Sequence, residues 1–300
     1  MLTGKHVAVI GGDARQLEVI RKLIELDAKI SLIGFDQLDE GFVGATKVQL
    51  EHVDFRTVEA IVLPVSGTSL EGEIETIFSN EKIVLKVDHL KATPEYCTVF
   101  SGISNQYLKK IVKDADRKLV ELFERNDVAI YNSIPTMEGT LMMVIQNTDI
   151  TIHRSNVVVL GFGRVGMTVA RAFHALGASV KVAANQSNLL ARIYEMGFEP
   201  IELSKLESKV ENTDVCINTI PAKVLTAKII SKMPTRSLII DLASKPGGTD
   251  FRYAEKRGIK AMLAPGLPGI VAPKTAGQII ANVLSKLLIE EQNNIEEDQS

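Results

Sequence analysis

Short apolar runs alternate with amphipathic stretches along the whole chain, and each kind of segment predicts a different element. In the first half, the apolar runs predict strands at 6–10, 29–33, 60–65, 82–87 and 128–131. Between them, apolar residues at helical spacing predict helices at 15–26, 70–78, 107–125 and 137–147. The alternation restarts at residue 156, with predicted strands at 156–160, 178–184, 198–201, 213–218, 237–241 and 259–263. The helices predicted for this second half lie at 164–176, 188–196, 203–209, 223–232, 250–257 and 275–288.

Strands that alternate with helices form parallel βαβ units with right-handed crossovers. The two series therefore predict an α/β protein of two doubly wound, parallel-sheet (Rossmann-like) domains with a cleft between them. The first predicted domain covers 1–130, is Rossmann- or flavodoxin-like and binds the substrate. The second covers 131–300, binds a nucleotide and includes the last helix.

A glycine-rich turn with the spacing of a dinucleotide site follows the strand at 156–160. It reads Gly161-Phe162-Gly163-Arg164-Val165-Gly166, which is G-x-G-x-x-G between a strand and a helix. In such a turn the first glycine allows the tight bend, the second lets a pyrophosphate approach the backbone, and the third lets the helix pack closely. The helix start then offers N–H groups to the phosphates. The alternative is a glycine turn that serves packing only.

The end of the next predicted strand bears on which dinucleotide is bound. NAD sites usually place an acidic residue there for the ribose 2′-hydroxyl, but this chain has Asn185-Gln186-Ser187 and no acid until Glu195. With Ser187 and Arg192 available to a 2′-phosphate, the pattern favours NADP. The alternative interpretation of Arg192 is an ordinary solvated charge on a helix.

The first glycine turn, Gly11-Gly12-Asp13, differs from the second because it puts a carboxylate where a phosphate would lie. Asp13 suits the N-cap of the following helix, so we interpret this turn as structural. The alternative is that Arg15 or Gln16, at the start of that helix, contacts a substrate.

The carboxyl ends of the later strands are expected to face the nicotinamide. The expected cofactor contacts there are Thr219, Ile220, Pro221, Asp241 and Ala243. Asp241 suits either a general base or a hydrogen-bond acceptor, and Lys245 and Lys274 either bind carboxylates or lie on the surface. The catalytic residue stays unassigned, with Lys245 and Asp241 as candidates.

Two further segments are candidates for substrate binding. Ser66-Gly67-Thr68 follows an apolar run and could hold a carboxylate through hydroxyl and N–H groups, or could simply form a loop. The segment 135–140, which includes Glu138, lies near the predicted domain boundary and is predicted to begin a helix.

Composition and charge narrow the function. The 300 residues include 34 Lys and Arg and 37 Asp and Glu, so the net charge is −3. The chain therefore has no overall positive field that would attract nucleic acid. No apolar run approaches the ~18 residues of a membrane span. Two isolated cysteines and five scattered histidines form no metal motif. The isolated cysteines suit a reducing compartment, and we expect the protein to be cytoplasmic. All five histidines precede residue 175, which disfavours a 2-hydroxy-acid dehydrogenase with a later histidine acid–base.

Four strings together resemble the family of the dipicolinate synthase A subunit from spore-forming bacteria. They are DLASKPGGT at 241–249, APGLPGIVAPKTAG at 264–277, GGDARQ at 11–16 and PTMEGTLMMVIQNT at 135–148. The resemblance implies NADP-dependent formation of pyridine-2,6-dicarboxylate (dipicolinate) from the 4-hydroxy-tetrahydrodipicolinate or dihydrodipicolinate pool. It also implies that the partner is the flavoprotein-like B subunit of dipicolinate synthase, and that the protein works in the mother cell of a sporulating bacterium.

The candidate residues of this chain are compatible with the oxidation to dipicolinate. Aromatisation drives the oxidation, so no histidine acid–base is required, and Arg15, Ser66, Thr68 and Lys245 suit the two substrate carboxylates. Two alternatives stay open: a dehydrogenase acting on another small carboxylate, and a non-catalytic subunit that senses a dinucleotide. A homo-oligomer is compatible with all three.

Overall fold

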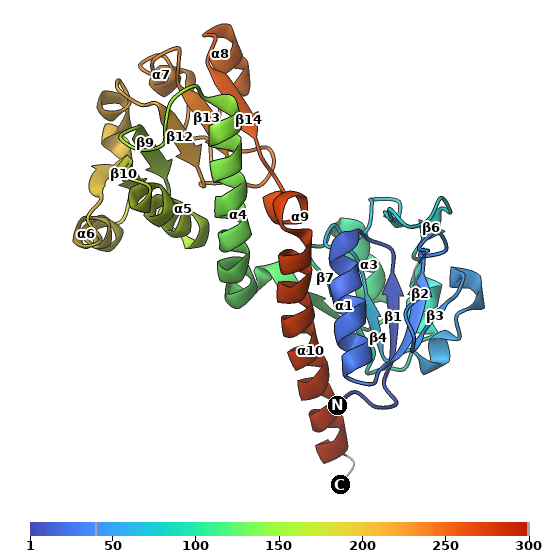
Figure 1. Ribbon diagram of the computed structural model, residues 1–300. Helices are drawn as coiled ribbons and strands as arrows, with labels where there is room; N and C mark the ends of the chain where they lie inside the picture. Colours follow the sequence, from blue (N-terminus) through green and yellow to red (C-terminus); the bar gives the residue numbers. More distant parts are fainter. Residues whose placement is uncertain (40, 299–300) are drawn as a thin grey trace. The chain divides into compact units, whose positions relative to one another are not determined.

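The computed structural model describes residues 1–39 and 41–298 as two compact units, each built on its own sheet (Figure 1). The first unit contains residues 1–129 together with the chain from Pro273, and the second contains Ile130–Ala272.

The first unit is a parallel sheet with helices on both faces. Its elements are β1 (His6–Ile10), α1 (Ala14–Glu25), β2 (Lys29–Ile33), β3 (Ala45–Lys47), η1 (Leu50–His52), η2 (Phe55–Thr57), β4 (Ala60–Val62), β5 (Glu73–Ile74), β6 (Ile83–Val84), α2 (Val87–Lys91), β7 (Thr98–Ser101), α3 (Gln106–Asp114), β8 (Lys118–Glu121), η3 (Leu122–Glu124) and α10 (Pro273–Asp298). The six-stranded order is β3-β2-β1-β4-β7-β8, and β5 and β6 form a separate antiparallel pair.

The second unit repeats this architecture. Its elements are α4 (Asn126–Asn147), β9 (Asn156–Leu160), α5 (Arg164–Ala175), β10 (Ser179–Ala184), α6 (Ser187–Glu195), β11 (Glu199–Glu202), η4 (Leu203–Lys209), β12 (Val215–Asn218), α7 (Ala227–Ile230), β13 (Leu238–Asp241), α8 (Phe251–Lys256), β14 (Lys260–Leu263) and α9 (Leu267–Val271). The strand order is β11-β10-β9-β12-β13-β14, and every pairing in the sheet is parallel.

Numbered within its unit, each sheet has the order 3-2-1-4-5-6, which is typical of dinucleotide-binding domains. The strand order reverses beside the first strand, where Val9 lies opposite Leu32 and Val62 in one sheet. In the other, Val159 lies opposite Val182 and Ile217. Ligands of such sheets bind at this reversal, beyond the carboxyl ends of the strands. The predicted fold class is therefore confirmed.

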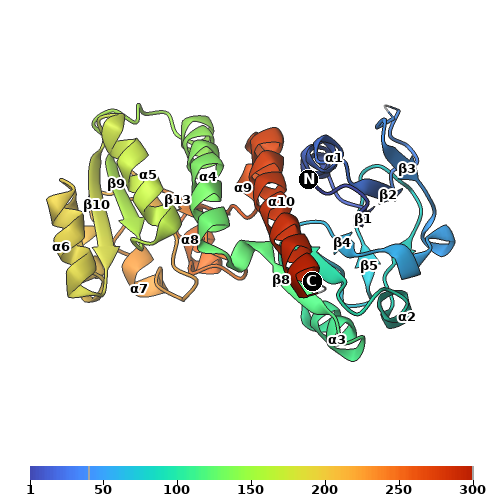
Figure 2. The ribbon, with the colours of Figure 1, turned by 90° about the horizontal axis from the view of Figure 1, so that it is seen from below.

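The central strands β1, β4, β12 and β13 are buried along their whole length because both faces of each sheet are covered. In β1, Val7 and Val9 join one core cluster with α1 and α10, while Ala8 and Ile10 join another with α3. Figure 2 shows α1 and α10 on one side of this sheet and α3 on the other. The residues of β9 alternate in the same way, toward α4 and α5 or toward η4, α7 and α8.

Several predicted elements of the first half are wrong. Residues 70–78 form no helix but contain β5, which pairs with β6, so the strand predicted at 82–87 is only the two residues Ile83–Val84 and lies outside the main sheet. The helix predicted at 107–125 ends at Asp114, because Asp116 adopts a positive φ of 54° and Lys118–Glu121 pairs with β7. The strand predicted at 128–131 lies inside α4.

The last helix packs in the first unit, and not in the second domain to which the predicted boundary assigned it. Its buried side chains Ile280, Leu284 and Leu288 share a core cluster with Val19 and Leu23 of α1. The two helices lie side by side in both views (Figures 1 and 2). An apolar stripe on a helix predicts that it packs, but does not specify which sheet it covers.

Candidate nucleotide and substrate sites

The glycine turn between β9 and α5 has the geometry that its sequence predicts. Gly161 has a φ of +94°, and a Cβ there would lie 2.5 Å from the Thr219 hydroxyl oxygen. A Cβ on Gly166 would lie 2.2 Å from the Gly161 carbonyl oxygen. Both positions therefore require glycine, because the turn, the helix and the loop after β12 approach each other closely.

Gly163 requires glycine for no such packing reason. A Cβ on Gly163 would meet no atom of the described residues within 4 Å, and its φ of −87° is open to any residue. It is the N-cap of α5 and provides no side-chain cap, and the first intrahelical bond runs from Met167 N–H to the Gly163 carbonyl. Peptide N–H groups at a helix start have no partner within the helix and favour an anion. The open face at Gly163 could therefore hold an anionic group such as a diphosphate.

The remaining residues of the motif have different surroundings. Phe162 is buried and packs edge-on against Phe198, so its side chain belongs to the core. Val165 is half-buried, packs at the edge of the same core cluster, and is followed by the buried Gly166. Arg164 is exposed on the first turn of α5.

The end of β10 carries no acidic side chain. Asn185 and Gln186, between β10 and α6, and Ser187, the first residue of α6, are all exposed, and no side chain caps α6. Arg192 lies on the same helix, and its guanidinium donates to the Glu195 carboxylate at 2.8 Å. The ion pair is exposed, so it holds Arg192 only weakly.

Asp241 is a hydrogen-bond acceptor buried at the end of β13. Its carboxylate accepts bonds from Asn218 Nδ2 (3.0 Å), Ala243 N (3.1 Å), Gly248 N (2.8 Å) and the Thr249 hydroxyl (2.6 Å). Its exposed fraction is 0%. Of the two interpretations of Asp241, the acceptor is therefore the one the geometry supports, because a general base must reach its substrate. Asp241 and Ala243, which is also buried, shape the loop after β13.

The loop after β12 lies against the glycine turn. Thr219 donates through its hydroxyl to the Leu160 carbonyl at 2.8 Å, and Ile220 N–H donates to Asn218 Oδ1 at 3.0 Å. Thr219 and Ile220 are half-buried and Pro221 is exposed. The reversal of strand order between β9 and β12 thus brings residues 161–166 and 219–220 together.

The glycine turn of the first unit is filled by its own chain. Gly12 N–H donates to the Glu75 carbonyl at 2.8 Å, and Ile77 N–H donates to the Gly12 carbonyl at 3.0 Å. A Cβ on Gly11 would lie 2.8 Å from the same Glu75 oxygen. The segment 74–77 thus lies where a dinucleotide would place its phosphates, which supports the structural interpretation of this turn.

Asp13 and Arg15 form a pair at the start of α1. Asp13 Oδ1 accepts the Arg15 backbone N–H at 3.0 Å, which caps the helix, and the Arg15 guanidinium donates to both carboxylate oxygens. Burial alone would raise the pKa of the Asp13 carboxyl, but the hydrogen bonds and charge of Arg15 outweigh burial and lower that pKa. The pair holds the Arg15 side chain in a fixed position.

A cavity of about 330 Å³ opens beside this pair. It lies at the strand reversal between β1 and β4, and its lining is Gly12, Asp13, Arg15, Pro64, Ser66, Glu75, Thr76 and Ile77. The cavity therefore brings together Arg15 and Ser66, two of the predicted substrate contacts, and adds Glu75.

The neighbours of Ser66 are oriented differently. Gly67 is buried with a φ of +68°, and a Cβ there would lie 2.7 Å from the Ile103 carbonyl oxygen. Thr68 is buried, and its hydroxyl has no hydrogen-bond partner among the described residues. Gln16 is also buried and donates to the Leu63 carbonyl at 3.2 Å. Of this group, only Ser66 lines the cavity.

The other predicted substrate residues do not lie in this cavity. Glu138 is exposed in the middle of α4, which begins at Asn126, so the predicted helix start at 135–140 is wrong. Lys245 is exposed in the loop between β13 and α8 of the second unit, and Lys274 is exposed on the first turn of α10.

The cysteines are unsuited to chemistry. Burial raises the pKa of the Cys97 thiol to about 11 and that of Cys216 to about 12, so both stay protonated. Within residues 1–39 and 41–298, no cluster of three or more His, Cys, Asp or Glu could hold a metal ion. No helix in this part of the chain is long and apolar enough to cross a membrane.

Comparison with known proteins decides the family. A curated relative, the dipicolinate synthase A subunit of Bacillus subtilis (strain 168), is 63% identical over 292 residues, covering 97% of this chain and 98% of the relative. The chain belongs to the family of the dipicolinate synthase A subunit. Residues 6–123 match the model of the N-terminal domain of that A subunit, and residues 128–298 match the alanine dehydrogenase/PNT C-terminal domain.

Solved structures of the dipicolinate synthase A subunit have the same fold. The crystal structure from Bacillus halodurans has a TM-score of 0.95 at 66% identity, covering 96% of this chain and 99% of that chain. The structure from Bacillus subtilis also has a TM-score of 0.95, at 62% identity, with 98% and 99% covered. The resemblance stated from the sequence is confirmed over nearly the whole chain.

Proposed function

We propose that this chain is an NADP-dependent oxidoreductase that forms dipicolinate from a dihydropyridine dicarboxylate derived from 4-hydroxy-tetrahydrodipicolinate. The observation that carries the proposal is the open G-x-G-x-x-G turn at the strand reversal of a 3-2-1-4-5-6 sheet, in a chain of this dipicolinate synthase family. The match of residues 128–298 to an alanine dehydrogenase domain supports a nicotinamide dinucleotide as the ligand.

The second unit would hold the cofactor, which supplies a hydride acceptor when bound. The N–H groups of the turn 161–166 would bind the diphosphate. Thr219, Ile220, Pro221 and the backbone at Ala243 lie on loops at the carboxyl edge of the same sheet and would bound the nicotinamide.

NADP is proposed because the end of β10 offers amide and hydroxyl groups and no carboxylate. Asn185, Gln186 and Ser187 are exposed there, and Arg192 is one turn further along α6. An Arg192→Ala variant would test this choice by calorimetric titration with NADP and with NAD. NADP affinity should fall about tenfold and NAD affinity little, while Glu195→Gln, which frees Arg192, should not weaken NADP. Equal losses for both nucleotides would contradict contact with the 2′-phosphate.

The first unit would hold the dicarboxylate. Its cavity presents a guanidinium, fixed by Asp13, and the Ser66 hydroxyl, which are suitable donors for a carboxylate. Lys245 and Glu138, on the second unit, stay proposed substrate contacts, and Lys245 a proposed catalytic candidate.

The reaction balances without a strong acid. A dihydropyridine dicarboxylate and NADP⁺ give dipicolinate, NADPH and one proton, and aromatisation of the ring favours the products. A 4-hydroxy-tetrahydro precursor must first lose water. The protein must then mainly provide a group that accepts the proton released from the ring.

Direct assay separates this proposal from its alternatives. The full chain, with and without the B subunit of dipicolinate synthase, is incubated with freshly prepared 4-hydroxy-tetrahydrodipicolinate and NADP while NADPH and the pyridine product are followed by absorbance. Formation of both in equal amounts supports the proposal. Binding of nucleotide without turnover in either mixture favours a sensing role, and turnover of another carboxylate instead favours a different dehydrogenase.

The B subunit of dipicolinate synthase as a partner, and action in the cytoplasm of the mother cell, are part of the proposal. Support for the partner comes from the family to which the chain belongs, whose members are named as the A subunit of the synthase. Co-purification of the two proteins tests the partnership, and a fluorescent fusion imaged during sporulation tests the compartment.

A further inference from the structure

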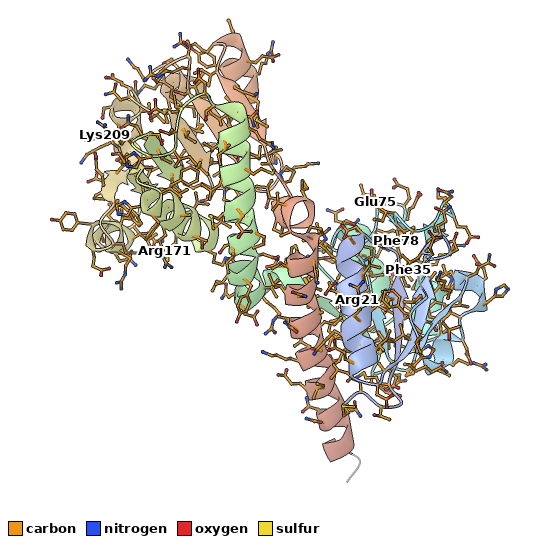
Figure 3. All side chains as sticks on the ribbon, viewed as in Figure 1. Arg21, Phe35, Glu75, Phe78, Arg171 and Lys209 are labelled. Carbon is orange, nitrogen blue, oxygen red and sulfur yellow. The ribbon has the colours of Figure 1, made fainter. Side chains whose placement is uncertain are left out.

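The cavity of the first unit contains a second carboxylate besides that of Asp13. Glu75 lines it together with Arg15 and Ser66, on the segment that follows β5. Figure 3 shows Glu75 at the end of this unit where α1 begins. A cavity suited to a substrate with two negative charges thus also holds a negatively charged side chain.

The backbone around Glu75 is held on both sides. Gly12 N–H donates to the Glu75 carbonyl, and the Thr76 hydroxyl donates to the Gly34 carbonyl at 2.8 Å. Ile74 is buried in the core directly before it. The side chain of Glu75 therefore projects from a fixed segment, as a group that acts on a bound substrate must.

Among the titratable groups that line the cavity, Glu75 is the one suited to accept a proton. The Arg15 guanidinium carries hydrogen-bond donors and no acceptor, so it cannot serve as the base. Asp13 is paired with Arg15, which lowers the pKa of its carboxyl and makes it a poor base. The Glu75 carboxylate, by contrast, makes no hydrogen bond or ion pair within residues 1–39 and 41–298, and it is exposed.

The charge of a bound dicarboxylate favours protonation of the Glu75 carboxylate. Beside a dicarboxylate it is repelled, and the repulsion disappears when it takes up a proton. We propose that Glu75 is the general base that removes the ring proton during aromatisation. This inference rests on the proposed function.

Atoms and electrons balance in this step. The C–H bond at one sp³ ring carbon breaks, its proton moves to a carboxylate oxygen of Glu75, and its electron pair becomes a ring double bond. The hydride that balances this step would leave the neighbouring sp³ carbon, and the nicotinamide nucleotide of the proposed function would supply its acceptor. Glu75 later releases its proton to water, which the exposed position permits.

The test compares Glu75→Gln with Glu71→Gln in the full chain. Both side chains are exposed, with Glu71 before β5 and Glu75 directly after it, and Glu71 is not part of the cavity lining. Glu75→Gln should lower kcat by about 100-fold or more, with a larger primary isotope effect for substrate deuterated at the carbon that loses the proton. Glu71→Gln should stay within about twofold of wild type, and Glu75→Asp should retain more activity than Glu75→Gln.

Binding of dipicolinate provides a measurement without turnover. Removal of the repelling charge should make Glu75→Gln bind dipicolinate about fivefold more tightly than wild type does in calorimetry. A kcat within about twofold of wild type, or affinity that falls together with kcat, would overturn the proposal. An inactive wild-type chain would refute the proposed function, while the affinity comparison would still decide whether Glu75 lies at a dicarboxylate site.

Discussion

The backbone N–H of Gly12 donates to the carbonyl oxygen of Glu75 at 2.8 Å. The glycine turn of the first unit therefore uses a donor on its own chain, where the corresponding turn of the second unit is open at Gly163. Two sheets of identical strand order thus differ at the position where a dinucleotide would bind. This difference is the physical reason to expect one nucleotide and one substrate, and not two nucleotides.

Gly163→Asp should abolish nucleotide binding without unfolding the chain. The new side chain meets no described atom within 4 Å of its Cβ, but its carboxylate would face the diphosphate. Repulsion of this kind should weaken NADP by at least about 100-fold in calorimetric titration. Gly163→Ala, which adds no charge, is the control for folding. Unchanged affinity in a folded Gly163→Asp protein would mean that the phosphates lie elsewhere.

Arg15→Gln should weaken dipicolinate binding by about tenfold or more, because a guanidinium is the strongest carboxylate donor in the cavity. The chain offers a matched control in Arg56, whose guanidinium pairs with Asp54 two residues before it, as Arg15 does with Asp13. Arg56 is exposed and does not line the cavity, so Arg56→Gln should leave dipicolinate affinity unchanged. Equal effects of the two substitutions would rule out the cavity as the substrate site.

Asp241→Asn should act on stability. The substitution turns an amide N–H₂ group toward donors that now reach a carboxylate, so the free energy of unfolding should fall by about 2–4 kcal/mol in denaturant titration. A general base would behave in the opposite way, with kcat lost and stability kept. A loss of kcat with unchanged stability would make Asp241 a catalytic candidate again.

The stability of the first unit should depend on the protonation of His6. Burial lowers the pKa of this imidazole, and the charge of Lys29 adds to the effect. The ring nitrogens share hydrogen bonds of 2.8 Å with Thr57 and Ser31. The unfolded chain binds the proton near pH 6.5, and the folded chain only at lower pH.

The free energy of unfolding should therefore decrease as the pH falls from about 6.5 toward the lower folded pKa, by at most ~1.4 kcal/mol per pH unit for this site. His6→Gln should flatten that slope in denaturant titrations between pH 5 and 7.5. His52→Gln, at an exposed position, should leave the slope as in wild type. An identical slope in all three proteins would contradict this assignment.

The second parallel sheet and the nucleotide turn could be predicted because their signals are local, whereas the strands β3, β7 and β8 of the first sheet are absent from the prediction. Apolar runs such as Val157–Leu160, followed by a spaced glycine motif and an amphipathic stretch, leave few alternatives for the backbone. The family resemblance was also accessible, since it depends on strings of residues. The sequence also offers the acceptor role as one of two alternatives for Asp241, because this carboxylate stands at the end of a predicted strand.

The segment 70–78 shows what local signals miss. Leu70, Ile74, Ile77 and Phe78 have helical spacing, yet Gly72 has a φ of +84° and Leu70 and Ile77 are 66% and 65% exposed. Pairing with β6 and the bond from Gly12 to Glu75 decide the conformation, and both partners are distant in sequence. A predicted helix there kept Glu75 from being a candidate. Likewise, the stripe on α10 predicted packing without naming α1 as its partner.

In the proposed function, a nicotinamide nucleotide binds to the second unit, with its diphosphate on the N–H groups of the turn 161–166. A crystal structure of the full chain soaked with NADP and dipicolinate tests it most directly. We expect diphosphate density at Gly161–Gly166 and dicarboxylate density beside Arg15. Nucleotide density at Gly11–Gly12, or a fully occupied nucleotide anywhere other than the second glycine turn, would contradict it.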